Sequence, residues 1–158
     1  EVRDLVLDPG TQLAPTERAL IHRVLDLKYR TVGQIARPLS LADTVNAQTP
    51  VSEVVRLCRE NGHTRLPVWD SGQSHARIAG VVSLKNILYD VSGVPRLTAG
   101  DYLRPALFLE EGLPLEEGLR RLQRSGQPLA IIVDGARRER GFLTLVDVLG
   151  TVFGEVSL

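Results

Sequence analysis

The stretch GFLTLVD at residues 141–147 decides the fold, because a close copy of it, GVVSLKN, stands at residues 80–86. The segments in front of the two stretches correspond as well, since three residues of the first half recur 64 positions later: Pro50 as Pro114, Gly62 as Gly126 and Asp70 as Asp134. The offset falls to 61 from Gly80 to Gly141, which places a short deletion in a surface turn of the second copy. The chain is therefore organised as two repeated units.

Each unit alternates between the periodicities of helices and strands. Apolar residues spaced three and four apart predict an amphipathic helix that begins at Pro50 or Pro114 and ends near a glycine. Two apolar runs separated by a polar turn predict a strand pair, and a last helix follows Ser83 or Thr144. A further short strand is expected in front of each unit, at residues 41–45 and 107–109. The predicted fold class is mixed α+β.

The composition narrows the possible partners. The chain has 158 residues and a formal charge of zero, so no overall field draws it to nucleic acid, and none is expected as a partner. The longest weakly charged stretch, residues 141–154, is shorter than the roughly 20 residues that span a bilayer. Cys58 is the single cysteine, which favours a reducing compartment. The sequence contains no Met, and we expect it to be part of a longer protein.

An N-terminal region precedes the repeat. Residues 15–27 carry apolar side chains on one helical side, and Thr31 with Gln34 forms the pattern of a capping box. This region is interpreted either as a linker from an upstream domain or as a lid over the core. The expected division is an N-terminal linker over residues 1–34, a first unit over residues 35–95 and a second unit over residues 96–158.

The repeated pattern G-x-x-[S/T]-x-x-[D/N] after a strand resembles the cystathionine-beta-synthase (CBS) domain pair, also called a Bateman module. Residues 17–27, 31–38, 62–68 and 141–155 resemble, more narrowly, the cytosolic region of CorC-type and ancient-conserved-domain magnesium and cobalt transport proteins. The resemblance implies two CBS units, each a three-stranded sheet with two helices, related by a pseudo-two-fold axis. It also implies a homodimer through the CBS helices, an attached transmembrane domain and a location on the cytoplasmic side of the membrane.

The candidate site lies at the junction of strand and helix in the second unit. Free backbone N–H groups at a helix start favour a phosphate, the Thr144 hydroxyl donates to it, and the Asp147 carboxylate one turn later accepts both hydroxyls of a ribose. The expected ligand is an adenine nucleotide, ATP or AMP, with or without Mg²⁺. The remaining predicted site residues would hold the adenine and the phosphates: Arg37, Pro38, Leu39, Arg65, Leu66 and Pro67.

The alternative is that Thr144 and Asp147 only cap the helix, because T-x-x-D is also a capping box that needs no ligand. The first unit offers Ser83 and Asn86 as a weaker half-site, since a neutral amide lacks the charge-assisted bonds that a carboxylate makes with ribose. A nucleotide site and a simple helix cap at Thr144 and Asp147 imply different functions. The leading prediction is a regulatory module that senses a nucleotide and controls a magnesium or cobalt transport domain, and the alternative is a dimerisation or interaction module without a ligand.

Catalysis and metal binding are not expected. The sequence shows neither a nucleophile paired with a base nor the lysine of a P-loop, so we predict no catalytic residue and no enzyme activity. His22, His63 and His75 are far apart and lack partners at ligand spacing, so no metal site is predicted.

Overall fold

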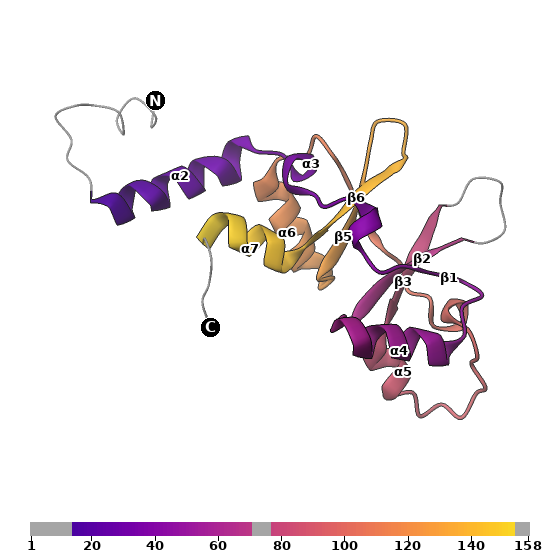
Figure 1. Cartoon of the computed structure of the whole chain (residues 1–158). Helices are drawn as coiled ribbons and strands as arrows, with labels where there is room; N and C mark the ends of the chain where they lie inside the picture. The colour runs from indigo at the N-terminus through magenta and orange to yellow at the C-terminus, as the bar shows by residue number, and fades with distance from the viewer. Residues whose placement is uncertain (1–13, 71–76, 154–158) are drawn as a thin grey trace.

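The computed structural model describes residues 14–70 and 77–153, and these form two units of α+β structure (Figure 1). Each unit contains one three-stranded sheet, in which the first two strands are parallel and the last two antiparallel. The predicted fold class, with two tandem units built alike, is confirmed.

The first unit has strand order β1-β2-β3. Its elements are β1 (Val45–Asn46), α4 (Val51–Asn61), β2 (Arg65–Trp69), β3 (Ile78–Ser83) and α5 (Leu84–Leu88). The second unit has strand order β4-β5-β6. Its elements are β4 (Leu107–Glu110), α6 (Leu115–Ser125), β5 (Leu129–Val133), β6 (Glu139–Thr144) and α7 (Leu145–Phe153).

The helices α4 and α6 begin and end as their sequences predict. Pro50 and Pro114 precede them, where a missing N–H costs no hydrogen bond. Gly62 and Gly126 follow them with φ angles of 72° and 69°, the left-handed conformation that glycine adopts without a steric penalty.

Among the described residues, buried apolar side chains form three clusters. One lies within the first unit and includes Leu66, and a second lies within the second unit and includes Leu143. The third joins the two units, because Ile78 and Val81 of β3 pack with Leu129 and Phe142 of β5 and β6. The two sheets therefore share one apolar interface, which fixes the place of each unit relative to the other.

Two short helical segments cross between the units. The helix α3 (Val32–Ile35) precedes the first unit but packs on the second, where the N–H of Gly33 donates to the oxygen of Glu111 at 2.9 Å. The 3-10 helix Ala99–Tyr102 precedes the strands of the second unit but packs on the first unit, where the N–H of Gly100 donates to the oxygen of Ala47 at 2.9 Å. Each unit is thus packed by a segment that lies next to the other unit in the sequence.

The N-terminal helix α2 (Pro15–Tyr29) lies along α6 and α7 of the second unit (Figure 1). The capping box predicted for the next helix is confirmed by a 2.9 Å hydrogen bond from the N–H of Thr31 to Oε1 of Gln34. Within the described ranges, no helix is both long and apolar enough to cross a membrane.

One expected strand is shorter than predicted. The strand expected at residues 41–45 begins only at Val45, because residues Leu39–Leu41 form a 3-10 turn closed by the N–H of Ala42 on the oxygen of Leu39. The tip of the predicted turn at residues 70–76 lies mostly outside the described residues.

Candidate functional site

The junction between β6 and α7 is held by a reciprocal pair of hydrogen bonds. The Thr144 hydroxyl oxygen accepts the N–H of Asp147 at 3.0 Å, and Oδ2 of Asp147 accepts the N–H of Thr144 at 3.1 Å. Two of the N–H groups that a helix start leaves without intrahelical partners are satisfied in this way. The capping box therefore forms with protein atoms alone.

Arg37 reaches this junction from the crossing segment. Its backbone N–H and C=O each form a 2.9 Å hydrogen bond with Phe142 of β6, so the backbone of Arg37 extends the second sheet. Its guanidinium Nη2 lies 3.1 Å from Oδ1 of Asp147. The Asp147 side chain is only 13% exposed, whereas that of Arg37 is 60% exposed.

Gly141 makes this crossing possible. A Cβ atom at this position would collide with the backbone oxygen of Arg37, so only glycine lets the two backbones approach. The same relation holds in the first unit, where a Cβ on Gly80 would collide with the backbone oxygen of Arg104. The glycine that opens each repeated stretch is therefore explained by packing and not by ligand contact.

A cavity of about 380 Å³ opens beside the junction and lies between the two units. The predicted site residues that line it are Arg37, Arg65, Pro67, Thr144 and Asp147. The cavity combines two guanidinium groups with a helix start and the carboxylates of Asp43 and Asp147. Such a site suits an anionic ligand that also carries hydroxyl groups.

The other predicted residues lie elsewhere. Leu66 is 1% exposed and packs in the core of the first unit, because successive side chains of a strand point to opposite faces and its neighbours Arg65 and Pro67 face the cavity. Leu39 packs against the cluster between the units, and Pro38 is exposed just beyond Arg37. None of these three is among the residues that line the cavity.

The sequence-based prediction missed part of the lining. The residues not anticipated include Asp43, His63, Thr64, Pro128, Leu129 and Phe142. Nε2 of His63 lies 2.9 Å from Oδ2 of Asp43, a buried carboxylate oxygen that accepts no hydrogen bond from the described residues. Among the described residues, no group of three or more His, Cys, Asp or Glu side chains is placed to hold a metal ion.

A second repeat would have found the crossing arginines. Residues 31–38 read TVGQIARP and residues 98–105 read TAGDYLRP, so Arg104 is the counterpart of Arg37. The structure confirms this correspondence, since Arg104 exchanges two 2.9 Å backbone hydrogen bonds with Val81 of β3.

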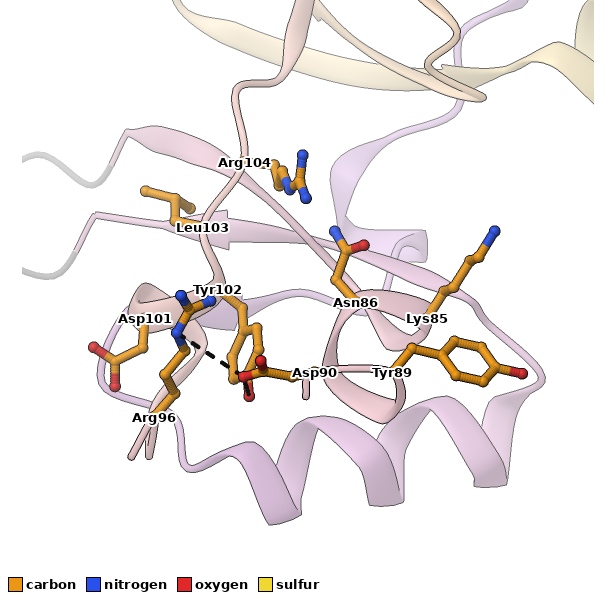
Figure 2. A pocket seen from close by; sticks show the side chains of 9 residues that line it. All are labelled: Lys85, Asn86, Tyr89, Asp90, Arg96, Asp101, Tyr102, Leu103 and Arg104. Carbon is orange, nitrogen blue, oxygen red and sulfur yellow. Dashed lines mark hydrogen bonds and ion pairs between the residues drawn. The ribbon is translucent and has the colours of Figure 1, made fainter. Parts of the chain in front are cut away.

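The weaker half-site predicted in the first unit is built differently. Ser83 precedes α5 but makes no capping hydrogen bond with its side chain. Ser83 and Asn86 therefore lie at one junction, but they do not close a capping box there. Asn86 and Arg104 line a separate cavity of about 310 Å³. Figure 2 shows Arg104 and Asn86 on one side of this cavity and Arg96, Asp90 and Tyr102 on the other.

Charged and aromatic groups form a network at the cavity of the first unit, which Asn86 and Arg104 also line. The Tyr102 hydroxyl donates to Oδ2 of Asp90 at 2.7 Å, and the Arg96 guanidinium lies 5.3 Å from the centre of the Tyr102 ring. Hydrogen bonds from the hydroxyl and N–H of Ser92, with a further one from Tyr102, lower the pKa of Asp90 to about 2. Asp90 therefore stays ionised and ties α5 to the crossing segment.

Comparison with known proteins extends this description. A UPF0053 protein from the cps region of Klebsiella pneumoniae is 32% identical over 142 residues, which cover 90% of this chain and 44% of that protein. The magnesium and cobalt efflux protein CorC of Salmonella typhimurium is 24% identical over 160 residues, which cover 99% of this chain and 54% of CorC. The chain thus spans about half or less of the length of these two relatives.

A solved structure is also similar. The CBS domain of a bacterial CNNM/CorC family Mg²⁺ transporter, determined in complex with ATP, matches with a TM-score of 0.78 and 28% identity, covering 90% of this chain and all of that one. The family model described as CBS domain matches residues 32–93. Together with the repeat, these matches confirm the resemblance noted in the sequence. Residues 32–93 thus match the CBS domain family, and the chain is similar over most of its length to the CBS domain of a CNNM/CorC family magnesium transporter.

Proposed function

We propose that this chain is a regulatory module that binds an adenine nucleotide in the cavity between its two units and controls an attached magnesium or cobalt transport domain. The observation that carries the proposal is the joining of Thr144, Asp147, Arg37 and Arg65 around one cavity. The cavity volume of about 380 Å³ falls within the common range for small-molecule sites. The related transporter domain bound to ATP supports the same choice of ligand.

The proposed roles follow from the donors and acceptors that remain. The N–H of Leu145 donates to the oxygen of Pro128, and the N–H of Asp147 donates to the Thr144 hydroxyl. Neither contact uses the N–H of Val146, which would donate to a phosphate. The Thr144 hydroxyl accepts a hydrogen bond from Asp147 and still has its own proton to donate. Arg65 and Arg37 would add positive charge. Because ATP carries more negative charge than two arginines balance, Mg²⁺ would accompany a triphosphate.

Control of transport would require the module to have two arrangements with different nucleotide affinities, because a ligand that binds both equally shifts nothing. Both relatives are longer than this chain and one is named an efflux protein, which supports the proposal of an attached transmembrane domain with this chain on the cytoplasmic side of the membrane. A homodimer is proposed through the helices that follow the two junctions. Leu88 of α5 and Val146 of α7 are large apolar residues left 55% and 76% exposed in one chain.

Equilibrium unfolding in the presence and absence of nucleotide tests the proposal. ATP or AMP at 100 times its dissociation constant is expected to raise the free energy of unfolding by about 2.7 kcal/mol. The variant Asp147→Ala is expected to lose this gain. A wild-type chain whose stability does not respond to ATP, ADP or AMP, with and without Mg²⁺, would contradict nucleotide binding.

The alternative function, a dimerisation module without a ligand, is favoured by one observation. The capping box and the ion pair of Asp147 are complete with protein atoms. Sedimentation of the chain at increasing concentration separates the two functions. A dimer whose formation and stability are indifferent to nucleotide supports the alternative.

A further inference from the structure

Both carboxylate oxygens of Asp147 have partners in the structure. Oδ2 accepts the N–H of Thr144 at 3.1 Å, and Oδ1 lies 3.1 Å from the guanidinium of Arg37. A ribose that uses this carboxylate must therefore compete with one of the two. The N–H of Thr144 belongs to the fixed backbone at the end of β6, so Arg37 is the partner that is free to leave.

Arg37 is built to move at its side chain and not at its backbone. Two hydrogen bonds hold its backbone to Phe142, whereas its side chain is 60% exposed. The Asp147 side chain is 13% exposed, so losing its cation without replacement would leave a largely buried charge unpaired. The guanidinium loses little by leaving, whereas the carboxylate needs a new partner.

We propose that Arg37 makes this site selective for phosphorylated nucleosides, by pairing with Asp147 in the empty site and moving to the ligand phosphate when a nucleotide binds. This inference rests on the proposed nucleotide function. An unphosphorylated nucleoside must displace the guanidinium and offers it no new partner. A nucleotide supplies ribose hydroxyls to Asp147 and phosphate oxygens to Arg37, so each separated ion regains a partner.

The first unit provides a matched control. Arg104 has the same sequence context and the same backbone bridge as Arg37, but Asn86 stands where the second unit has Asp147. Arg104 therefore has no carboxylate to shield at the corresponding place. Removing Arg104 tests whether any arginine on a crossing segment has the same effect, or whether the pairing with Asp147 is required.

Calorimetric titration with adenosine, AMP, ADP and ATP tests the proposal on the full chain. The wild type is expected to bind ATP at least 100 times more tightly than adenosine. In Arg37→Ala this ratio is expected to fall at least tenfold, with adenosine affinity unchanged or increased because Asp147 has been exposed. Arg37→Lys, which retains a single point charge, is expected to fall between the two, and Arg104→Ala is expected to keep the wild-type ratio.

Three results would overturn the proposal, and they identify what failed. ATP binding to the wild type with an unchanged ratio in both Arg37 variants would overturn the selectivity alone. An equal loss of adenosine and ATP in these variants, with unfolding curves like those of the wild type, would show a general structural role. A wild type that binds neither ATP nor adenosine would overturn the proposed function as well.

Discussion

The two strand-to-helix junctions share a scaffold and differ in chemistry. Both place a glycine where a backbone crosses from the other half of the chain, and both receive an arginine on that crossing backbone. The second junction adds a carboxylate that completes a capping box and an ion pair, whereas the first has Asn86 and leaves Ser83 without a capping bond. The comparison separates residues that the fold requires from those that a ligand would require.

The largest expected effect tests the shared scaffold. Gly80→Ala and Gly141→Ala are each expected to lower the free energy of unfolding by about 3 kcal/mol, because the added methyl group meets a backbone oxygen that cannot rotate away. Urea unfolding measures the loss. Gly112→Ala is the control, since nothing lies within 4 Å of a Cβ there. A loss confined to one of the two glycines would show that the crossings are not equivalent.

The next effect tests the difference between the junctions. Asn86→Asp gives the first unit the carboxylate of the second, next to Arg104 in the same cavity. We expect the number of nucleotides bound per chain, measured by calorimetry, to rise toward two. With nucleotide at 100 times the dissociation constant of the new site, the free energy of unfolding is expected to rise by about 2.7 kcal/mol more. The reverse change, Asp147→Asn, is the paired control and is expected to remove binding at the second junction. An unchanged stoichiometry in Asn86→Asp would show that the first junction lacks more than a charge.

A smaller effect concerns the caps without any ligand. Thr144→Val keeps the shape of the side chain but removes the hydroxyl that accepts the N–H of Asp147, and we expect a loss of about 1 kcal/mol in the free energy of unfolding. Ser83→Ala is expected to cost less, because the Ser83 side chain makes no capping hydrogen bond. Equal losses would contradict the asymmetry between the two caps.

The smallest effect is a pH dependence that comes from Asp90, next to α5 of the first unit. Asp90 has a pKa of about 2 in the folded chain, below the value of about 3.9 for an unperturbed Asp. A lowered pKa stabilises the fold above the unfolded value, and the contribution disappears as the pH falls from about 4 to 2. Asp90→Asn should therefore be less stable than the wild type at pH 6 and approach it at pH 2. Its counterpart in the second unit is Thr151, which does not titrate, and Glu116→Gln controls for the loss of one exposed charge.

The periodicity of the sequence was sufficient for most of the fold. The repeat located both helices that begin after a proline and end at Gly62 or Gly126, and the structure confirms these limits. The predicted start of the short strand before the first unit was wrong, because residues 39–41 form a 3-10 turn. Such a turn is local and irregular, so no periodic signal announces it.

The site was less predictable because it is assembled from distant segments. The arrangement of Thr144 and Asp147 follows from their spacing of three residues, which is a local property. The position of Arg37 depends on a backbone pairing with Phe142, more than 100 residues away in sequence. Leu66 was predicted to contact adenine because it is apolar, but the alternation of side chains along β2 places it in the core of the first unit.

The crossing segments also bear on how such a chain could have arisen. The sheet of each half is completed by backbone that precedes the other half, through the bridges Arg37 to Phe142 and Arg104 to Val81. A single ancestral half with this geometry would have had nothing on its own chain to fill that edge. It would have needed a twin to lend the missing backbone, so pairing of subunits would have come before the fusion of two genes into one.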